Sequence, residues 1–176
     1  TGKFIREISI AGPSAHMYNN IEIVGNSIFL DIRYPQPYPS DKYYLLREVT
    51  LEGKFKRDWL DMDIVNKGGG KSEYSNIMKS LYATPDGVFY TKEFMDVIYK
   101  LEENSVRPVK AIESQFKISN QDIADMNSGD NYYAQTKSLD KVFSLSKVTT
   151  GVNFNYFSYK KGAAPFSVVE RDGTTT

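Results

Sequence analysis

The chain has no cysteine and a single histidine among its 176 residues. These two residue types supply many protein nucleophiles, proton carriers and zinc ligands. Their scarcity excludes a disulfide framework, a thiolate nucleophile and a cysteine-based zinc site. His16 stands in a glycine–proline loop, and no Gly-x-Ser-x-Gly sequence accompanies it. We interpret His16 as a surface residue, and we expect no enzyme, no cofactor and no bound metal.

An excess of charge of one sign and long apolar runs are also missing. The 22 basic and 22 acidic residues cancel, so no long-range field draws the chain toward nucleic acid or anionic lipid. No stretch approaches the roughly 18 to 20 apolar residues of a membrane-spanning helix. We therefore expect no membrane partner, and nucleic acid is an unfavoured partner.

Aromatic residues, in contrast, are abundant: the chain has 13 Tyr, 10 Phe and 1 Trp. Their rings cover large areas of protein contact at a low cost in conformational entropy. A chain rich in contact-forming residues and poor in reactive ones is typical of a structural protein that binds partners. Six aromatic residues are candidate interface residues: Tyr38, Tyr43, Tyr44, Trp59, Phe157 and Tyr159.

Alternation of apolar and polar residues predicts most of the chain to be antiparallel strands. A favoured two-residue turn at Gly25–Asn26 predicts a hairpin between residues 21–24 and 27–34. A second hairpin joins 152–156 to 166–169 through a turn at 160–162. Further strands are expected at 3–10, 54–65 and 109–118, and residues 138–146 are compatible with either a strand or a short helix.

Helical spacing of apolar residues predicts short helices between these strands. Tyr74, Ile77, Met78 and Leu81 follow a possible cap at Ser72, which predicts a helix over 73–82. A second apolar stripe of Phe94, Met95, Ile98 and Leu101 predicts a helix over 91–104. Capping residues predict two shorter helices, at 41–47 and 119–126.

This order of elements predicts an α+β fold. We expect a mainly antiparallel sheet, arranged as a sandwich or a split barrel, with two or three short inserted helices. Residues 1–176 form one domain in this interpretation, with a helical insertion at 66–105 and C-terminal strands and a hairpin at 106–176. We identify no internal repeat in the sequence.

Two glycine-containing segments resemble ligand loops without completing their patterns. Gly68–Ser72 leads into a predicted helix, but the first glycine of a phosphate-binding loop is replaced by Val65. Residues 125–129 begin like a calcium loop, but the glycine comes one place early and Thr136 replaces the closing glutamate. A loop and a capped turn are the favoured interpretations.

Two alternatives to a structural role remain open at the sequence level. Residues 154–161 combine aromatic and basic side chains, which could form a nucleic-acid or ligand-binding module. Asp61 and Asp63 lie on one face of a predicted strand, where two carboxylates could hold a divalent cation for a metal-dependent enzyme. The solvated face of a strand is the commoner explanation for such alternating acids.

One stretch of the sequence resembles a known family. Residues 28–35 read as an alternating strand that ends in Tyr-Pro. Residues 38–43 read as the start of a helix that carries an acidic residue. Residues 58–63 read as a strand with an Asp-x-Leu-Asp pattern. This order, within residues 28–65, resembles the amino-terminal ring domain of distal tail proteins from long-tailed bacteriophages. The resemblance implies a ring of subunits that joins a tail tube to a tip or baseplate, without catalysis.

We therefore predict a structural subunit of a phage virion, an oligomeric ring component of the tail tip or baseplate. The expected partners are further copies of the chain and other virion structural proteins. The expected location is the virion, assembled in the host cytoplasm.

Overall fold

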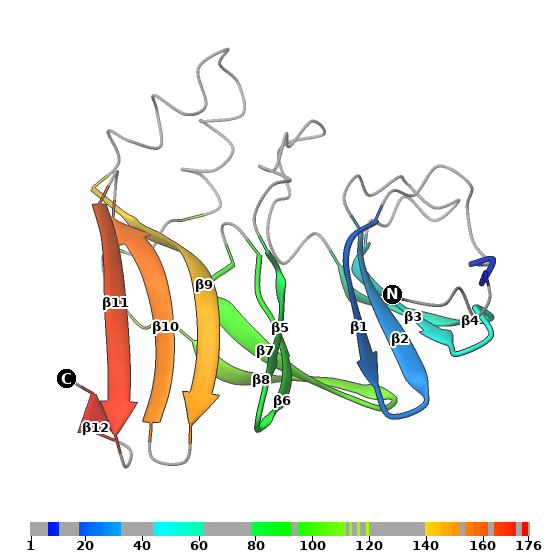
Figure 1. Cartoon of the computed structure of the whole chain (residues 1–176). Coiled ribbons are helices and arrows are strands. Elements are labelled where there is room, and N and C mark those ends of the chain that lie inside the picture. Colours follow the sequence, from blue (N-terminus) through cyan, green and yellow to red (C-terminus); the bar gives the residue numbers. More distant parts are fainter. Residues whose placement is uncertain are drawn as a thin grey trace, which may run out of the picture.

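Regular structure in the described part of the chain is entirely β. The computed structural model describes residues 7–10, 18–32, 44–61, 79–92, 95–111, 113, 116, 119, 140–151, 154–161, 164–171 and 174–175. These residues form twelve strands and contain no helix (Figure 1). The prediction of antiparallel sheet is confirmed, and the α+β class is corrected to all-β for these residues.

The strands form three antiparallel sheets of four strands each, and within each sheet every strand pairs with its neighbour in sequence. The first sheet contains β1 (Tyr18–Val24), β2 (Ser27–Ile32), β3 (Tyr44–Thr50) and β4 (Phe55–Asp61). The middle sheet contains β5 (Leu81–Thr84), β6 (Gly87–Tyr90), β7 (Val97–Glu102) and β8 (Ser105–Ala111). The third sheet contains β9 (Val142–Gly151), β10 (Phe154–Lys161), β11 (Ala164–Arg171) and β12 (Thr174–Thr175).

The three sheets spread like a fan from their first strands. β1 lies beside β5, and β5 lies beside β9. In Figure 1 the fourth strands of the outer sheets, β4 and β12, lie at opposite sides of the molecule. Each sheet therefore packs face to face on the next one in the chain.

Both faces of the middle sheet are buried in apolar contacts. One face, with Leu81, Tyr90 and Leu101, packs against the first sheet at Phe29 and Leu46. The opposite face packs against the third sheet through a second cluster of Tyr82, Phe89, Ile98, Val148 and Phe157. Burial of these two apolar clusters is the main favourable contribution to the free energy that holds the three sheets together.

The helices expected in the described regions are wrong. β3 begins at Tyr44, inside the helix expected at 41–47, and β7 occupies the centre of the helix expected at 91–104. A strand buried on both faces carries apolar residues at odd and even positions, so its sequence loses the period of two and resembles a buried helix. For the helix expected over 73–82, Leu81 and Tyr82 lie in β5, and residues 73–78 lie outside the described residues.

Predictions based on clear alternation or on a turn were more accurate. The hairpin around Gly25–Asn26 is confirmed as β1–β2, and the C-terminal hairpin as β10–β11. Residues 142–146 belong to strand β9, which resolves the open choice there. Glu7–Ile10 form no strand, and the strand expected at 109–118 ends at Ala111. The helix expected at 119–126 lies outside the described residues except for Ser119, which is not helical.

Candidate functional site

The first sheet turns apolar side chains away from the middle sheet. Alternation along β1 directs Val24 toward the middle sheet and Ile21 and Ile23 to the opposite side. Ile21 pairs with Leu30 and Ile23 with Ile28 across the sheet. Ile21 is 56% exposed and Ile23 is 62% exposed, although both lie in a strand of a well-packed sheet.

This apolar surface extends across all four strands of the first sheet. Phe55 of β4 pairs with the buried Val49 of β3 and is 49% exposed. We call this surface the outer face and define it by residues Ile21, Ile23, Ile28, Leu30, Val49 and Phe55. Ile8 and Ile10 cover its central part, whereas both margins remain accessible.

A buried ion pair stiffens the same face. Arg47 of β3 is fully buried, and its Nε and Nη2 donate to the two carboxylate oxygens of Asp58 at 2.8 and 3.0 Å. Its Nη1 also donates to the Tyr18 hydroxyl at 3.3 Å, and its guanidinium lies over the ring of Phe55. Two parallel hydrogen bonds fix the geometry of a guanidinium–carboxylate pair, so the outer face has a rigid base.

Polar contacts fix the packing between the first and middle sheets. Lys92 Nζ donates to Asp31 Oδ1 at 3.0 Å and to the Ile32 carbonyl at 2.8 Å. The Tyr90 hydroxyl donates to the same Asp31 oxygen at 3.0 Å. Asn20 of β1 donates to the Ser80 hydroxyl, just before β5, at 3.2 Å.

A second buried carboxylate lies on the same inter-sheet surface. Glu48 accepts hydrogen bonds from Ser27 at 2.7 Å and Trp59 Nε1 at 3.1 Å, and it pairs with Lys56 at 2.7 Å. The backbone N–H of Asn104, in the β7–β8 turn, also donates to Glu48. Burial raises the pKa of Glu48, but the bonds from Lys56, Ser27 and Trp59 outweigh burial and hold this pKa below its ordinary value.

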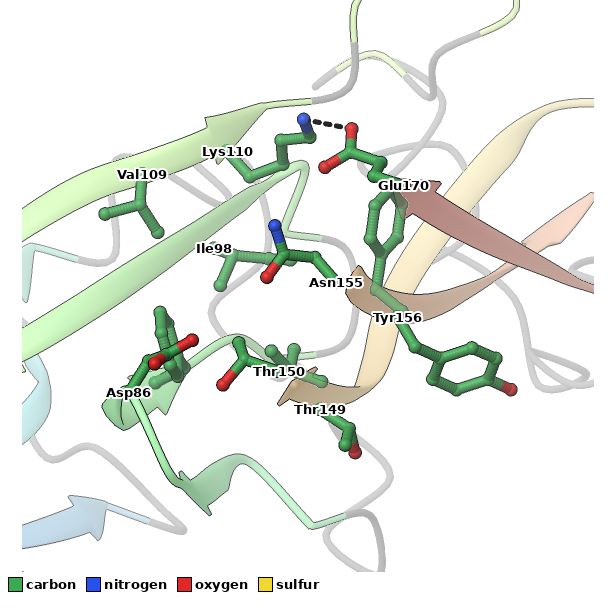
Figure 2. Close-up of a pocket in the computed structure, with 12 residues that line it drawn as sticks. Asp86, Ile98, Val109, Lys110, Thr149, Thr150, Asn155, Tyr156 and Glu170 are labelled. Carbon is green, nitrogen blue, oxygen red and sulfur yellow. Dashed lines mark ion pairs between the residues drawn. The ribbon is translucent and has the colours of Figure 1, made fainter. Parts of the chain in front are cut away.

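A cavity of about 190 Å³ opens between the middle and third sheets (Figure 2). Ile98, Val109 and Phe89 supply its apolar wall, and Thr150 and Asn155 supply polar groups. Figure 2 shows the ion pair between Lys110 and Glu170 at one side of the cavity. Its volume is below the roughly 300 to 1,000 Å³ of typical ligand sites, so only a very small molecule would fit.

Four of the six predicted interface residues lie in the described part of the chain, and three of these pack in the contacts between sheets. Phe157 is buried between the middle and third sheets, and Tyr159 packs against the same cluster. Trp59 is half-buried, packs against the cluster between the first and middle sheets, and donates to Glu48. Tyr44 is half-buried at the start of β3, and Tyr38 and Tyr43 lie outside the described residues. Their contact with a neighbouring subunit stays a prediction.

The aromatic and basic residues of 154–161 are divided between two faces of the third sheet. Phe157 and Tyr159 point toward the middle sheet, whereas in Figure 2 the ring of Tyr156 points away from the cavity. Lys161 pairs with Asp140 at 2.9 Å and lies over the ring of Phe116. This separation leaves no continuous stacking surface along β10, although Asn155 and Phe157 do line the cavity.

The remaining candidates for chemistry lie mostly outside the described residues. This holds for His16, Gly68–Ser72, Asp63 and residues 125–129. Asp61 is half-buried at the end of β4. Within the residues that the structure describes, no group of three or more His, Cys, Asp or Glu side chains could hold a metal ion.

Sequence reasoning missed the outer face, although a signal for it exists. Ile21 and Ile23 alternate with Glu22 in a predicted strand. Because Val24 is also apolar, the sequence does not indicate which face of this strand packs against the rest of the chain. The cavity has no sequence signal, because its lining comes from strands far apart in the chain. No helix in the described part of the chain has the length and hydropathy of a membrane span.

No protein-family model matches the chain, and no curated protein matches it. Among solved structures, the chain is similar to the crystal structure of a "Putative exported protein" from Bacteroides fragilis, with a TM-score of 0.71. The two sequences are 13% identical, so the likeness shows the fold alone. The match covers 92% of this chain and 46% of the other, so this chain spans about half the length of that protein.

Proposed function

We propose that the protein is a structural subunit that works by protein–protein contact and carries out no catalysis. The observation that carries this proposal is the outer face of the first sheet. Large exposed apolar side chains grouped on one sheet face are a common property of protein-binding surfaces. Ile21 and Ile23 form such a group at the β1 margin of this face, Phe55 is exposed at the β4 margin, and Ile8 and Ile10 pack on the centre between them.

The two contacts between sheets within the chain indicate what kind of partner suits this face. Each combines an apolar centre with polar contacts, such as Lys92–Asp31 at one and Thr84–Thr150 at the other. The outer face offers an apolar surface of the same kind. A partner that presents another apolar sheet face would bury it in the same way.

The phage-tail setting stays part of this proposal as a prediction. The resemblance to distal tail proteins falls on residues 28–65, which include most of β2 and all of β3 and β4 of the sheet that bears the outer face. Assembly through that sheet is compatible with a ring of subunits. The other virion proteins as partners, and the virion as location, rest on the sequence resemblance.

Sedimentation of the purified chain at micromolar concentration tests the contact-based role. We expect the unchanged chain to sediment as an assembly larger than one chain, and Ile23→Asp to sediment as a single chain. A buried unpaired carboxylate in an apolar contact is strongly unfavourable, so the substitution blocks the contact without touching the core. Circular dichroism checks that the variant is folded.

The matched control is Pro108→Asp, which places the same charge at an exposed position of β8, away from the outer face and from the cavity lining. We expect this variant to assemble like the unchanged chain. A chain that stays single at every concentration, or an assembly that Ile23→Asp leaves intact, contradicts the proposal.

A further inference from the structure

We infer that two copies of this chain close into a ring of six sheets, with the outer face of each first sheet covered by the third sheet of the other copy. This inference rests on the proposed contact-based function and names the partner. It starts from the fan in Figure 1, in which each sheet packs on the next with the first strands adjacent. Four-stranded sheets arranged radially around an axis are the construction of a β-propeller, which closes with roughly four to eight such sheets.

The size of the similar solved structure supports a unit of twice this length. Nearly the whole of this chain aligns with less than half of the Bacteroides fragilis protein. A fold of three sheets therefore occurs within a chain that has room for about three more. Two copies of the present chain supply the same number of sheets, and closed twofold assemblies are the commonest among homo-oligomers.

The far side of the third sheet suits the outer face. Phe157 points toward the middle sheet, so Tyr156 and Ser158 point to the far side. Ser146 and Ser158 share a hydrogen bond of 2.9 Å, and Tyr156 and Ser167 share another of 2.9 Å. Hydroxyl groups that are already paired can be covered by apolar side chains without losing a hydrogen bond. Ser158 is already buried within the chain, so the accessible part of the far side is the strip with Thr149, Tyr156 and Ser167.

The start of the chain supplies an independent observation. Gly2-Lys3-Phe4-Ile5-Arg6 repeats the pattern of Gly53-Lys54-Phe55-Lys56-Arg57, and the second copy of this motif begins β4, the fourth strand of the first sheet. Glu7–Ile10, which follow the first copy of the motif, lie against the outer face, where the fourth strand of a preceding sheet belongs. In the ring, Glu7–Ile10 of one copy extend the third sheet of the other.

Net charge does not oppose this pairing, because 22 basic and 22 acidic residues leave two copies without mutual repulsion. Within the chain, neighbouring sheets come closest at their first strands, β1, β5 and β9. In the ring, β9 of one copy therefore lies closest to β1 of the other. Val148 and Thr150 of β9 face the middle sheet, so the exposed Thr149 points to the far side. Thr149 of one copy therefore faces Ile23 in β1 of the other.

Cysteine cross-linking tests this arrangement cleanly, because the chain has no cysteine of its own. The variants are Ile23→Cys, Thr149→Cys and the chain with both changes, each treated with a short bismaleimide. We expect the double variant, and an equimolar mixture of the two single variants, to give covalent dimers. Neither single variant alone should cross-link in appreciable yield. Pro108→Cys, at an exposed position of β8, the edge strand of the middle sheet, is the background control.

The outcomes separate this inference from the proposed function. Cross-linking of Ile23→Cys to itself means that two outer faces meet, which overturns the ring but keeps the contact-based role. An assembly in sedimentation without any cross-link between the Ile23→Cys and Thr149→Cys variants also overturns the ring alone. A chain that neither cross-links nor assembles overturns both the ring and the proposed function.

Discussion

Single buried charges decide how firmly the sheets of this protein are held together. Glu48 and Asp31 each lie fully buried at the contact between the first and middle sheets, and each pairs with a lysine and with an aromatic side chain. Such groups are costly to bury alone and stabilising only when every partner is present. They therefore make the contact specific for one arrangement of the two sheets.

Glu48 gives a prediction for the pH dependence of stability. Its pKa in the folded protein lies below the ordinary value of 4.5, so its stabilising contribution is complete above that pH and is lost as the pH falls through the folded-state pKa. We expect Glu48→Gln to lower the free energy of unfolding at neutral pH by roughly 1.5 to 3 kcal/mol, the usual contribution of hydrogen bonds to a charged group.

Because glutamine does not titrate, the difference between Glu48→Gln and the unchanged chain should shrink below pH 4.5. Urea unfolding at a series of pH values measures this difference. Glu102 serves as a control, because its pKa is also lowered, chiefly by a hydrogen bond from Arg107, but its carboxylate is on the surface. A gap that stays constant with pH contradicts the role assigned to Glu48.

At the scale of the elements, turns and the alternation of apolar and polar residues could be recognised in the sequence. Strands that are buried on both faces could not. The β1–β2 hairpin follows from Gly25–Asn26, because the first residue of this turn has a positive φ, which favours glycine. β7 was expected as a helix, because Ile98 packs on the third sheet while Tyr99 and Leu101 pack on the first. No single chain segment reveals that a sheet has neighbours on both sides, so the three-sheet stack could not be derived.

The same limit explains the candidate site. The sequence drew attention to aromatic residues, but Phe157 and Tyr159 take part in contacts between sheets of one chain. The exposed apolar residues of the outer face are instead Ile21, Ile23 and Phe55, which look like ordinary strand residues in the sequence. The repeat of the Gly-Lys-Phe-x-Arg motif is too short to identify without the strand that it begins.

The β3–β4 turn carries the prediction at this scale. Gly53 has a φ of +80°, and a Cβ there would lie 2.3 Å from the backbone oxygen of Ser9. We expect Gly53→Ala to destabilise the fold by more than about 1 kcal/mol, because both the backbone conformation and the contact with Ser9 oppose a side chain. Thermal unfolding measures the loss.

Gly25→Ala is the matched control, because Gly25 also has a positive φ, but its added Cβ would meet only the side chain of Glu103. That side chain can move, so Gly25→Ala should cost less than Gly53→Ala. Equal losses for the two variants would show that the close approach of Ser9 is unimportant for holding Glu7–Ile10 on the outer face.

At the scale of the whole molecule, three sheets in a fan leave two terminal faces of unlike chemistry. The outer face of the first sheet is apolar, and the far side of the third sheet carries serine and tyrosine hydroxyls in mutual hydrogen bonds. Two unlike faces on one chain favour head-to-tail contacts between copies, and such contacts close when the rotation per copy divides a full turn. In the proposed ring, two fans of three sheets together complete one turn.

Small-angle X-ray scattering of the purified chain in solution tests this account most directly, because it gives mass and shape together. We predict a particle with twice the 20.0 kDa mass of one chain and the compact outline of a closed ring. A particle with the mass of one chain and the elongated outline of an open fan, unchanged with rising concentration, contradicts the account.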